Sequence, residues 1–208
     1  MPSTRYQKIN AHHYRHIWVV GDIHGEYQLL QSRLHQLSFF PKIDLLISVG
    51  DNIDRGPESL DVLRLLNQPW FTSVKGNHEA MALEAFETGD GNMWLASGGD
   101  WFFDLNDSEQ QEAIDLLLKF HHLPHIIEIT NDNIKYAIAH ADYPGSEYLF
   151  GKEIAESELL WPVDRVQKSL NGELQQINGA DYFIFGHMMF DNIQTFANQI
   201  YIDTGSPN

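Results

Sequence analysis

The chain has 208 residues, a length that allows one large domain or two small ones and a sizeable apolar core. It carries 29 acidic and 13 basic residues, so its formal charge is −16, which excludes a protein that holds nucleic acid or an anionic membrane by bulk charge. It has no cysteine, which excludes disulfides, thiolate nucleophiles, zinc-thiolate sites and iron–sulfur clusters.

The first half of the chain alternates between strand-like and helix-like patterns. Residues 17–20 form a short β-branched run that ends at a glycine, as a buried strand does, and residues 26–38 carry one leucine stripe at helical spacing. The runs 45–49 and 70–74 also end near glycines, and helical patterns follow them at 57–67 and 79–87. This alternation favours an α/β protein with parallel strands.

The second half has a different texture. Residues 92–122 are helical and aromatic, and strand-like runs follow Pro124. Turns are expected at residues 131–133 and at Asn198. The pattern predicts a second, mixed or antiparallel sheet packed on the first as a sandwich with helices outside. No linker or repeat interrupts the chain, so we expect a single domain over residues 1–208. The expected later strands are residues 125–129, 134–140, 182–186, 193–197 and 199–203.

The chain shows no signal for a membrane or an export route. No apolar stretch approaches the roughly 20 residues that a bilayer-spanning helix needs. The first five residues lead into a polar segment with several histidines rather than into the apolar core of a signal peptide. We therefore expect a cytoplasmic protein.

Polar clusters follow the three early strands. They read Gly-Asp-Ile-His-Gly at residues 21–25, Gly-Asp-Asn-Ile-Asp-Arg-Gly at 50–56 and Gly-Asn-His-Glu at 76–79, and later strand ends add His140 and His187. One such element alone is usually a turn or a helix cap. Because parallel strands end at one edge of a sheet, however, the clusters should converge. Oxygen and imidazole ligands without thiolate suit Mn²⁺, Fe or Zn²⁺.

The remaining histidines do not follow strand ends, and we assign them to packing or to the surface. They are His12, His13, His16, His35, His121, His122 and His125.

The three clusters and two later histidines resemble the signature of the metal-dependent PPP phosphoesterases, over about residues 16–205. Longer segments, among them 45–51, 98–102, 138–144 and 201–205, look like the small bacterial serine/threonine protein phosphatases of the PrpA type and like bacteriophage lambda phosphatase. The resemblance implies a calcineurin-like α/β fold. In that fold a β-sandwich of two mixed sheets is flanked by helices, with the site at the carboxyl ends of strands.

The resemblance also implies a dinuclear metal centre, with Mn²⁺ as the first choice and Fe or Zn²⁺ as alternatives. One metal would be held by Asp22, His24 and Asp51. The other would be held by Asp51, Asn77, His140 and His187, so that Asp51 bridges the two cations. Two cations at such a site can make a bridging hydroxide that attacks phosphorus directly.

Three further residues would act on the substrate. The guanidinium of Arg55 can grip two phosphate oxygens, and Asn77 is also assigned to phosphate binding. The family pattern makes His78 the general acid that protonates the departing alkoxide, with Asp54 orienting its ring.

The sequence departs from the family pattern at three places. Valine stands at 163, where the family has a second phosphate-binding arginine in a Trp-x-Arg context. Arg165, two residues later, is a candidate replacement, and the alternative is a solvated surface arginine. Met188 follows His187 where threonine is usual, so a hydrogen bond that supports this histidine is expected to be missing. The chain stops at residue 208, where the family continues into a terminal strand, so we expect that strand to be truncated.

The resulting prediction is a metal-dependent phosphatase of phosphoserine and phosphothreonine proteins, with phosphotyrosine as a further substrate. We expect a monomer whose partners are phosphoproteins and that binds neither nucleic acid nor membrane. One alternative is a hydrolase of dinucleoside polyphosphates, although those enzymes tend to lack an acid at the Asp54 position and to carry aspartate at the Glu79 position. The other is a catalytically weak metal-binding scaffold, which would need none of His78, Asp54 and Arg55.

Overall fold

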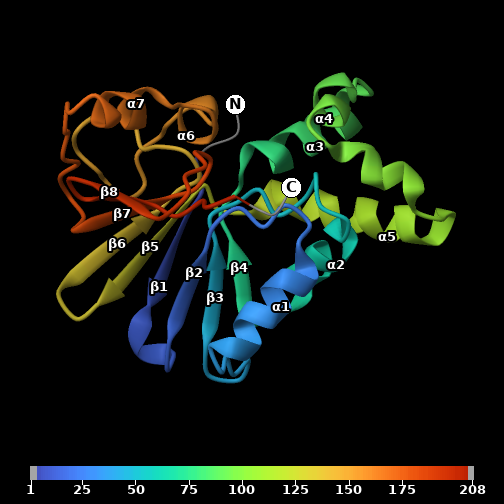
Figure 1. Ribbon diagram of the computed structural model, residues 1–208, viewed down its shortest axis with the longest axis horizontal. Helices are drawn as coiled ribbons and strands as arrows, with labels where there is room; N and C mark the ends of the chain where they lie inside the picture. The colour runs from blue at the N-terminus through green and yellow to red at the C-terminus, as the bar shows by residue number, and fades with distance from the viewer. Residues whose placement is uncertain (1–3, 206–208) are drawn as a thin grey trace.

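A computed structural model describes residues 4–205, and its strands form two sheets (Figure 1). The larger sheet contains, in spatial order, β1 (Tyr6–Asn10), β5 (Ile126–Asn131), β6 (Ile134–Ile138), β7 (Tyr182–Phe185), β9 (Gln199–Tyr201) and β8 (Gln194–Phe196). The smaller sheet contains β2 (Ile17–Val20), β3 (Leu45–Ser48) and β4 (Phe71–Ser73).

The strand directions confirm the α/β fold class and refine it. The pairs β5/β6 and β8/β9 are antiparallel, and the other pairs of the larger sheet are parallel, so that sheet is mixed. The smaller sheet is parallel in both of its pairs, as the alternation in the first half of the sequence predicted, whereas the resemblance implied that both sheets are mixed. The reason is that a helix returns the chain to the same end of the sheet after each of its first two strands.

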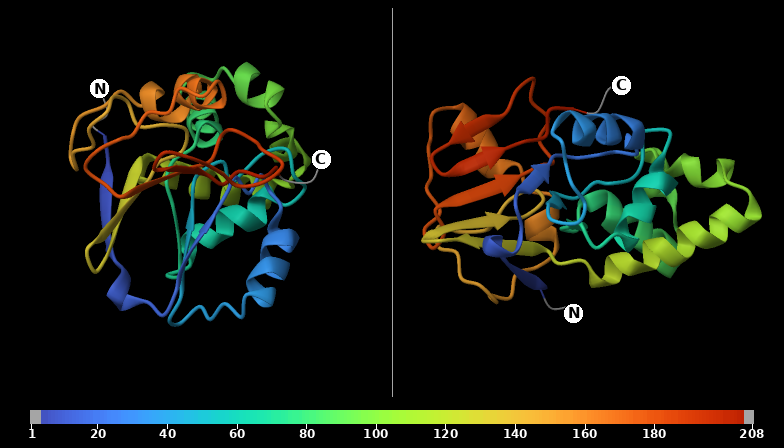
Figure 2. Two further views of the ribbon diagram at one scale, coloured as in Figure 1. Left: turned by 60° about the vertical axis from the view of Figure 1, so that its left-hand side comes forward. Right: turned by 90° about the horizontal axis from the view of Figure 1, so that it is seen from below.

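Helices cover the outer faces of both sheets (Figure 1). Figure 2 shows α3 to α5 projecting beyond the smaller sheet, on the side away from α7. The α-helices are α1 (Tyr27–Gln36), α2 (Ser59–Arg64), α3 (Asn77–Thr88), α4 (Asn92–Ala96), α5 (Asp107–Leu117), α6 (Ser157–Leu160) and α7 (Asp164–Leu170). Short 3-10 helices span Ala11–His13, Leu65–Asn67, Gly99–Asp104 and Leu118–His122.

Strand β3 shows how the sandwich is filled. Leu45, Ile47 and Val49 belong to a buried cluster that also contains residues of β5 and β6, so they fill the space between the sheets. Leu46 points the other way, into a cluster shared with leucines of α1. Alternate side chains of an extended strand face opposite sides, and here both sides are buried, which explains the uninterrupted apolar run.

The expected elements largely match the structure. The hairpins β5–β6 and β8–β9 form around the predicted turns, where Asp132 and Ala197 adopt positive φ. The sequence pattern did not indicate β1, an edge strand in which Ile9 alone is buried, nor the short helices α6 and α7. Within residues 4–205, no helix combines the length and apolarity that a membrane crossing requires. The expectation about the chain's end concerns residues 206–208, outside the described range.

Candidate active site

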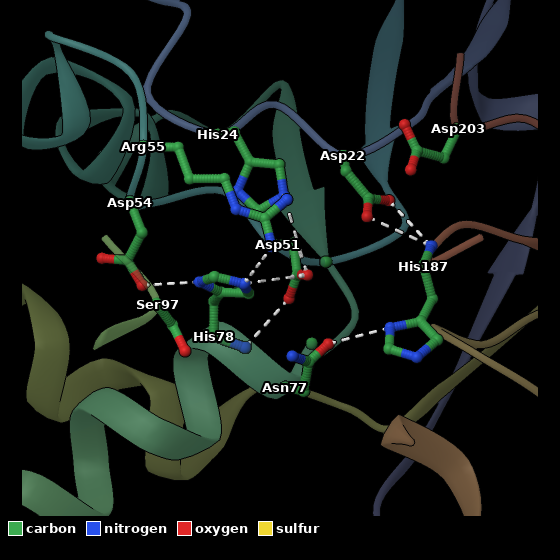
Figure 3. A network of polar contacts seen from close by, with 12 residues as sticks. Asp22, His24, Asp51, Asp54, Arg55, Asn77, His78, Ser97, His187 and Asp203 are labelled. Carbon is green, nitrogen blue, oxygen red and sulfur yellow. Dashed lines mark hydrogen bonds and ion pairs between the residues drawn. The ribbon is translucent and has the colours of Figure 1, made fainter. Parts of the chain in front are cut away.

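The loops after β2, β3, β6 and β7 meet the start of α3 at one edge of the sandwich (Figure 3). Two groups of metal-type ligand atoms form there, each with all its atoms within 4.8 Å of one another: His24, Asp51 and His78, and Asp51, His140 and His187. Asp51 belongs to both groups. The structure therefore gives Asp51 the shared position that the sequence resemblance implied.

Asn77 joins the second group. Its Oδ1 lies 2.8 Å from Nε2 of His140 and 3.0 Å from Nδ1 of His187. Asp51 Oδ2 lies 3.4 Å from the same Nε2 of His140. All four ligands predicted for one metal thus lie together, drawn from α3 and three different strand ends.

Asp22 lies beside the first group rather than within it. Its two carboxylate oxygens accept the backbone N–H of His187 at 3.2 and 3.1 Å, and Figure 3 shows the Asp203 side chain next to it. Burial raises the pKa of Asp22 well above its ordinary range, and the charges of Asp51 and Asp203 raise it further. The compact first group contains His78 where the sequence had suggested Asp22. The sequence had given Asp203 no role.

The donor set fits divalent cations. Burial lowers the pKa of His24 and of His187 to about 4, so both rings are neutral near pH 7 and can offer a nitrogen lone pair. Burial alone would lower the pKa of His140, but the adjacent Asp51 raises it to about 10. A cation at that nitrogen would take the place of the proton. Neutral imidazoles around a shared buried carboxylate are a ligand set for Mn²⁺, Fe or Zn²⁺.

Backbone strain is concentrated at this site. Eight described non-glycine residues have positive φ, and five of them are site residues: His24 (45°), Asp51 (50°), Asp54 (74°), Arg55 (68°) and His187 (64°). Left-handed backbone costs roughly 1 kcal/mol or more per non-glycine residue. The surrounding contacts therefore hold these loops in shapes that they would not adopt alone.

Glu79 supplies much of that restraint. Its fully buried carboxylate accepts the backbone N–H groups of Asp51, Asn52 and Gly76, each at 2.8 Å. A Cβ at Gly76 would overlap the Asp51 side chain and backbone, so only glycine fits. The sequence pattern included Glu79 in a motif but gave it no role. Its place in the first turn of a helix, three residues after Gly76, was the available signal.

His78 and Asp54 form a buried pair. Nδ1 of His78 lies 2.7 Å from Oδ2 of Asp54. Burial alone would lower the pKa of His78, but the hydrogen bond from Asp54 and the charge of Asp51 raise it. The N–H of Nδ1 donates to Asp54 Oδ2, and Nε2 faces the ligand cluster, 3.8 Å from Asp51 Oδ2. The geometry suits an acid that releases its proton from Nε2.

Arg55 connects the two histidines of the first group. Its Nη1 lies 3.0 Å from Nε2 of His24 and its Nη2 lies 3.1 Å from Nε2 of His78 (Figure 3). The residue is exposed at the mouth of the site. A planar fork at this position can bind two phosphate oxygens at once.

The structure does not bring Arg165 to the other predicted site residues. Its side chain is buried, so the surface alternative is wrong. Nε donates to Oδ1 of Asp142 at 2.8 Å, and Nη2 donates to the carbonyls of Tyr143 and Gly145 at 2.9 and 2.7 Å. Arg165 therefore braces the loop that follows His140.

The support of His187 also differs from the family pattern. With Met188 next to it there is no threonine hydroxyl nearby in sequence, but the backbone of Trp161 hydrogen-bonds the His187 ring. The altered Trp-Pro-Val segment thus reaches the ligand group of His187 through its backbone. Metal-binding histidines are commonly fixed by such a second hydrogen bond.

Comparison with known proteins places this geometry in a family. The sequence model of the calcineurin-like phosphoesterases matches residues 15–190. The chain belongs to that family. A curated relative, serine/threonine-protein phosphatase 2 of Salmonella typhimurium, is 60% identical, with 99% of this chain and 94% of the relative covered. The match therefore extends well beyond the ligand motifs of this phosphoesterase.

Two more distant similarities are one to a sequence relative and one to a solved structure. The symmetrical bis(5'-nucleosyl)-tetraphosphatase of Erwinia tasmaniensis is 32% identical, over 60% of this chain and 43% of its own length. The solved structure of a serine/threonine phosphatase from Saccharomyces cerevisiae superposes with a TM-score of 0.67 at 18% identity, covering 96% of this phosphoesterase and 71% of the yeast chain. The yeast structure supports the fold alone.

Proposed function

We propose that this phosphoesterase removes phosphate from phosphoserine and phosphothreonine in proteins, with phosphotyrosine as a further substrate. The observation that carries the proposal is the placement of His78, Asp54 and Arg55 against the ligand group of Asp51. The proposed phosphate clamp, proton donor and metal ligands thus face the same space. The curated phosphatase relative, which aligns with nearly the whole chain, supports the choice of substrate.

Two divalent cations, with Mn²⁺ as our choice, are the proposed cofactors. Asp22, His24 and Asp51 would hold one cation, with His78 beside them as the proton donor. Asp51, Asn77, His140 and His187 would hold the other. When bound, such cations acidify a shared water and neutralise charge on the phosphoryl group.

The chain's own residues would bind the substrate and move a proton. Arg55 binds two phosphate oxygens, and Asn77 offers its amide from the start of α3. His78 gives the proton on Nε2 to the departing seryl or threonyl oxygen, while its Nδ1–H stays bonded to Asp54. General acid catalysis of this kind contributes about 10²–10⁴ in rate. Arg165 has no part in this scheme, because its donors are used in bracing the loop at Asp142.

We further propose that residues 1–208 act as one phosphoesterase domain, as a cytoplasmic monomer whose partners are phosphoproteins. Hydrolysis of a dinucleoside polyphosphate is the competing activity. It is supported by a relative of lower identity that aligns with a smaller part of the chain.

One set of assays tests the proposal. Phosphate release is measured from a phosphoserine peptide, p-nitrophenyl phosphate and diadenosine tetraphosphate, each with Mn²⁺ and with a chelator, and bound metal is measured by mass spectrometry. We expect metal-dependent hydrolysis of the peptide and two equivalents of metal. Hydrolysis of the nucleotide alone would overturn the protein-phosphatase proposal. Inactivity on all three substrates with two metals bound would favour a scaffold.

A further inference from the structure

The carboxylate of Asp54 has more hydrogen-bond donors than the pair with His78 requires. Nε1 of Trp94 lies 2.9 Å from Oδ1 and 3.1 Å from Oδ2. Nε1 of Trp101 lies 2.8 Å from Oδ1. Asp54 is completely buried and Trp94 is nearly so. Two indole N–H groups therefore point at a single buried carboxylate, and the proton donor His78 is on its other side.

This arrangement favours the charged form of Asp54 and fixes its direction. Burial raises the pKa of Asp54, while the hydrogen bonds from His78, Trp101 and Trp94 act against that rise. An indole N–H donates but does not accept, so these neighbours offer no acceptor for a carboxyl hydrogen. With Oδ1 held by two indoles, Oδ2 is aimed at Nδ1 of His78.

The two tryptophans belong to a segment that is itself attached to the phosphate-binding loop. Gly98 lies between them in the chain, and its carbonyl accepts the backbone N–H of Arg55 at 3.2 Å. Gly98 has a φ of 103°, and a Cβ there would come within 2.9 Å of that Arg55 nitrogen. The segment thus packs directly against the backbone of Arg55, the residue that follows Asp54, and both residues have positive φ.

We propose that Trp94 and Trp101 are positioning residues for the proton transfer, which act by orienting the Asp54 carboxylate toward His78. Neither indole nitrogen bonds a predicted metal ligand, so their effect must pass through Asp54. The inference rests on the proposed role of His78 as the acid that protonates the departing oxygen.

The test compares two small esters that differ in their leaving group. Phenyl phosphate releases a basic phenolate that needs a proton, whereas p-nitrophenyl phosphate releases a stable anion that does not. We expect Trp101→Phe to lower kcat on phenyl phosphate by about tenfold, a part of the 10²–10⁴ that general acid catalysis contributes. The loss on p-nitrophenyl phosphate should stay within about twofold by the same reasoning. KM and bound metal should be unchanged.

The matched control is Trp70→Phe. Trp70 packs edge-on against Phe39, with ring centroids 5.3 Å apart, in the cluster around α1, which contains none of the predicted site residues. The Trp70→Phe variant should leave the ratio of the two kcat values unaltered. Trp94 lies in the helical core, so Trp101→Phe, with its half-buried ring, decides the question, and thermal unfolding shows whether it is folded.

A double variant tests the route through Asp54. In the Asp54→Asn background, Trp101→Phe should not change the ratio of the two kcat values any further. Equal losses on both esters, lost metal, or a further change in that background would overturn the inference. Hydrolysis of both esters but of no phosphopeptide would overturn the proposed function instead, and the ester ratio would still decide the role of the tryptophans.

Discussion

Two buried carboxylates beside the site each pair with a basic side chain, yet the pairs differ in what they leave free. In one pair, Asp54 Oδ2 lies 2.7 Å from His78, and Nε2 of His78 remains directed at the ligand cluster. In the other, Asp142 Oδ1 lies 2.8 Å from Nε of Arg165. The remaining donors of Arg165 end on carbonyls and on Gln175.

A carboxylate that is buried and paired with a basic side chain is not for that reason part of a catalytic group. Burial raises the pKa of both Asp54 and Asp142, and the basic partner acts against the rise in each case. In the His78 pair, Nε2 lies beside Arg55, 3.1 Å from its Nη2, at the place where a substrate would bind. The Arg165 pair satisfies its donors within the fold, so it can only stabilise.

The largest expected effect comes from removing the imidazole of His78. His78→Asn should lower kcat on a phosphoserine peptide by about 10²–10⁴, because the departing alkoxide loses its proton donor. Bound metal, measured by mass spectrometry, should be nearly intact. Loss of one equivalent of metal would instead make His78 a ligand, which its place in the first compact group would allow.

Breaking the second pair should affect the fold and not the chemistry. Arg165→Gln leaves Asp142 buried without its cation, which costs about 3–5 kcal/mol, measured as the free energy of unfolding in urea. The KM for phosphopeptide at a temperature where the variant is folded should be unchanged. A raised KM with unaltered stability would return Arg165 to the phosphate-binding role that its sequence position suggested.

A smaller effect is expected at Arg55, which binds the phosphate of the substrate and takes no part in the proton transfer. Arg55→Lys keeps the positive charge but loses the planar fork, so kcat/KM should fall by about 10- to 100-fold. Steady-state kinetics on phosphopeptide and on p-nitrophenyl phosphate should show similar losses, because both share the phosphate. A loss confined to the peptide would place Arg55 outside the phosphate site.

The smallest effect tests a third pair, remote from the cluster. Glu156 lies 2.7 Å from His125 and 3.1 Å from Lys75, and His125 in particular lowers the pKa of Glu156 from 4.5 to about 2. Because folding lowers this pKa, the charged Glu156 stabilises the fold above pH 4.5. This stabilisation is lost as the pH falls toward about 2. Because this carboxylate is 30% exposed, we expect its charge to contribute about 1–2 kcal/mol to the free energy of unfolding.

Urea unfolding of the wild type and Glu156→Gln measures that contribution. The wild type should be the more stable near neutral pH, and the two curves should approach each other in acid. A gap that stays constant with pH would mean that packing, and not charge, explains the difference between the two proteins.

The sequence by itself determined which residues gather at the strand ends. Because parallel β-strands share one carboxyl edge, Asp51, Asn77, His140 and His187 could be placed together from their position after apolar runs. The same periodicity predicted the two sheets and the hairpin around Asp132. These features follow from local sequence patterns and from the order of strands and helices along the chain.

Only the tertiary structure decided what each side chain points at. Arg165 lies near the phosphate-binding position in sequence but turns inward to Asp142, and Trp94 and Trp101 bond Asp54 from 40 and 47 residues away. Glu79 bonds backbone groups of a loop 27 and 28 residues earlier. Such contacts depend on how the helices pack on the sheets. A donor and an acceptor that are distant in sequence meet only once the intervening core is packed.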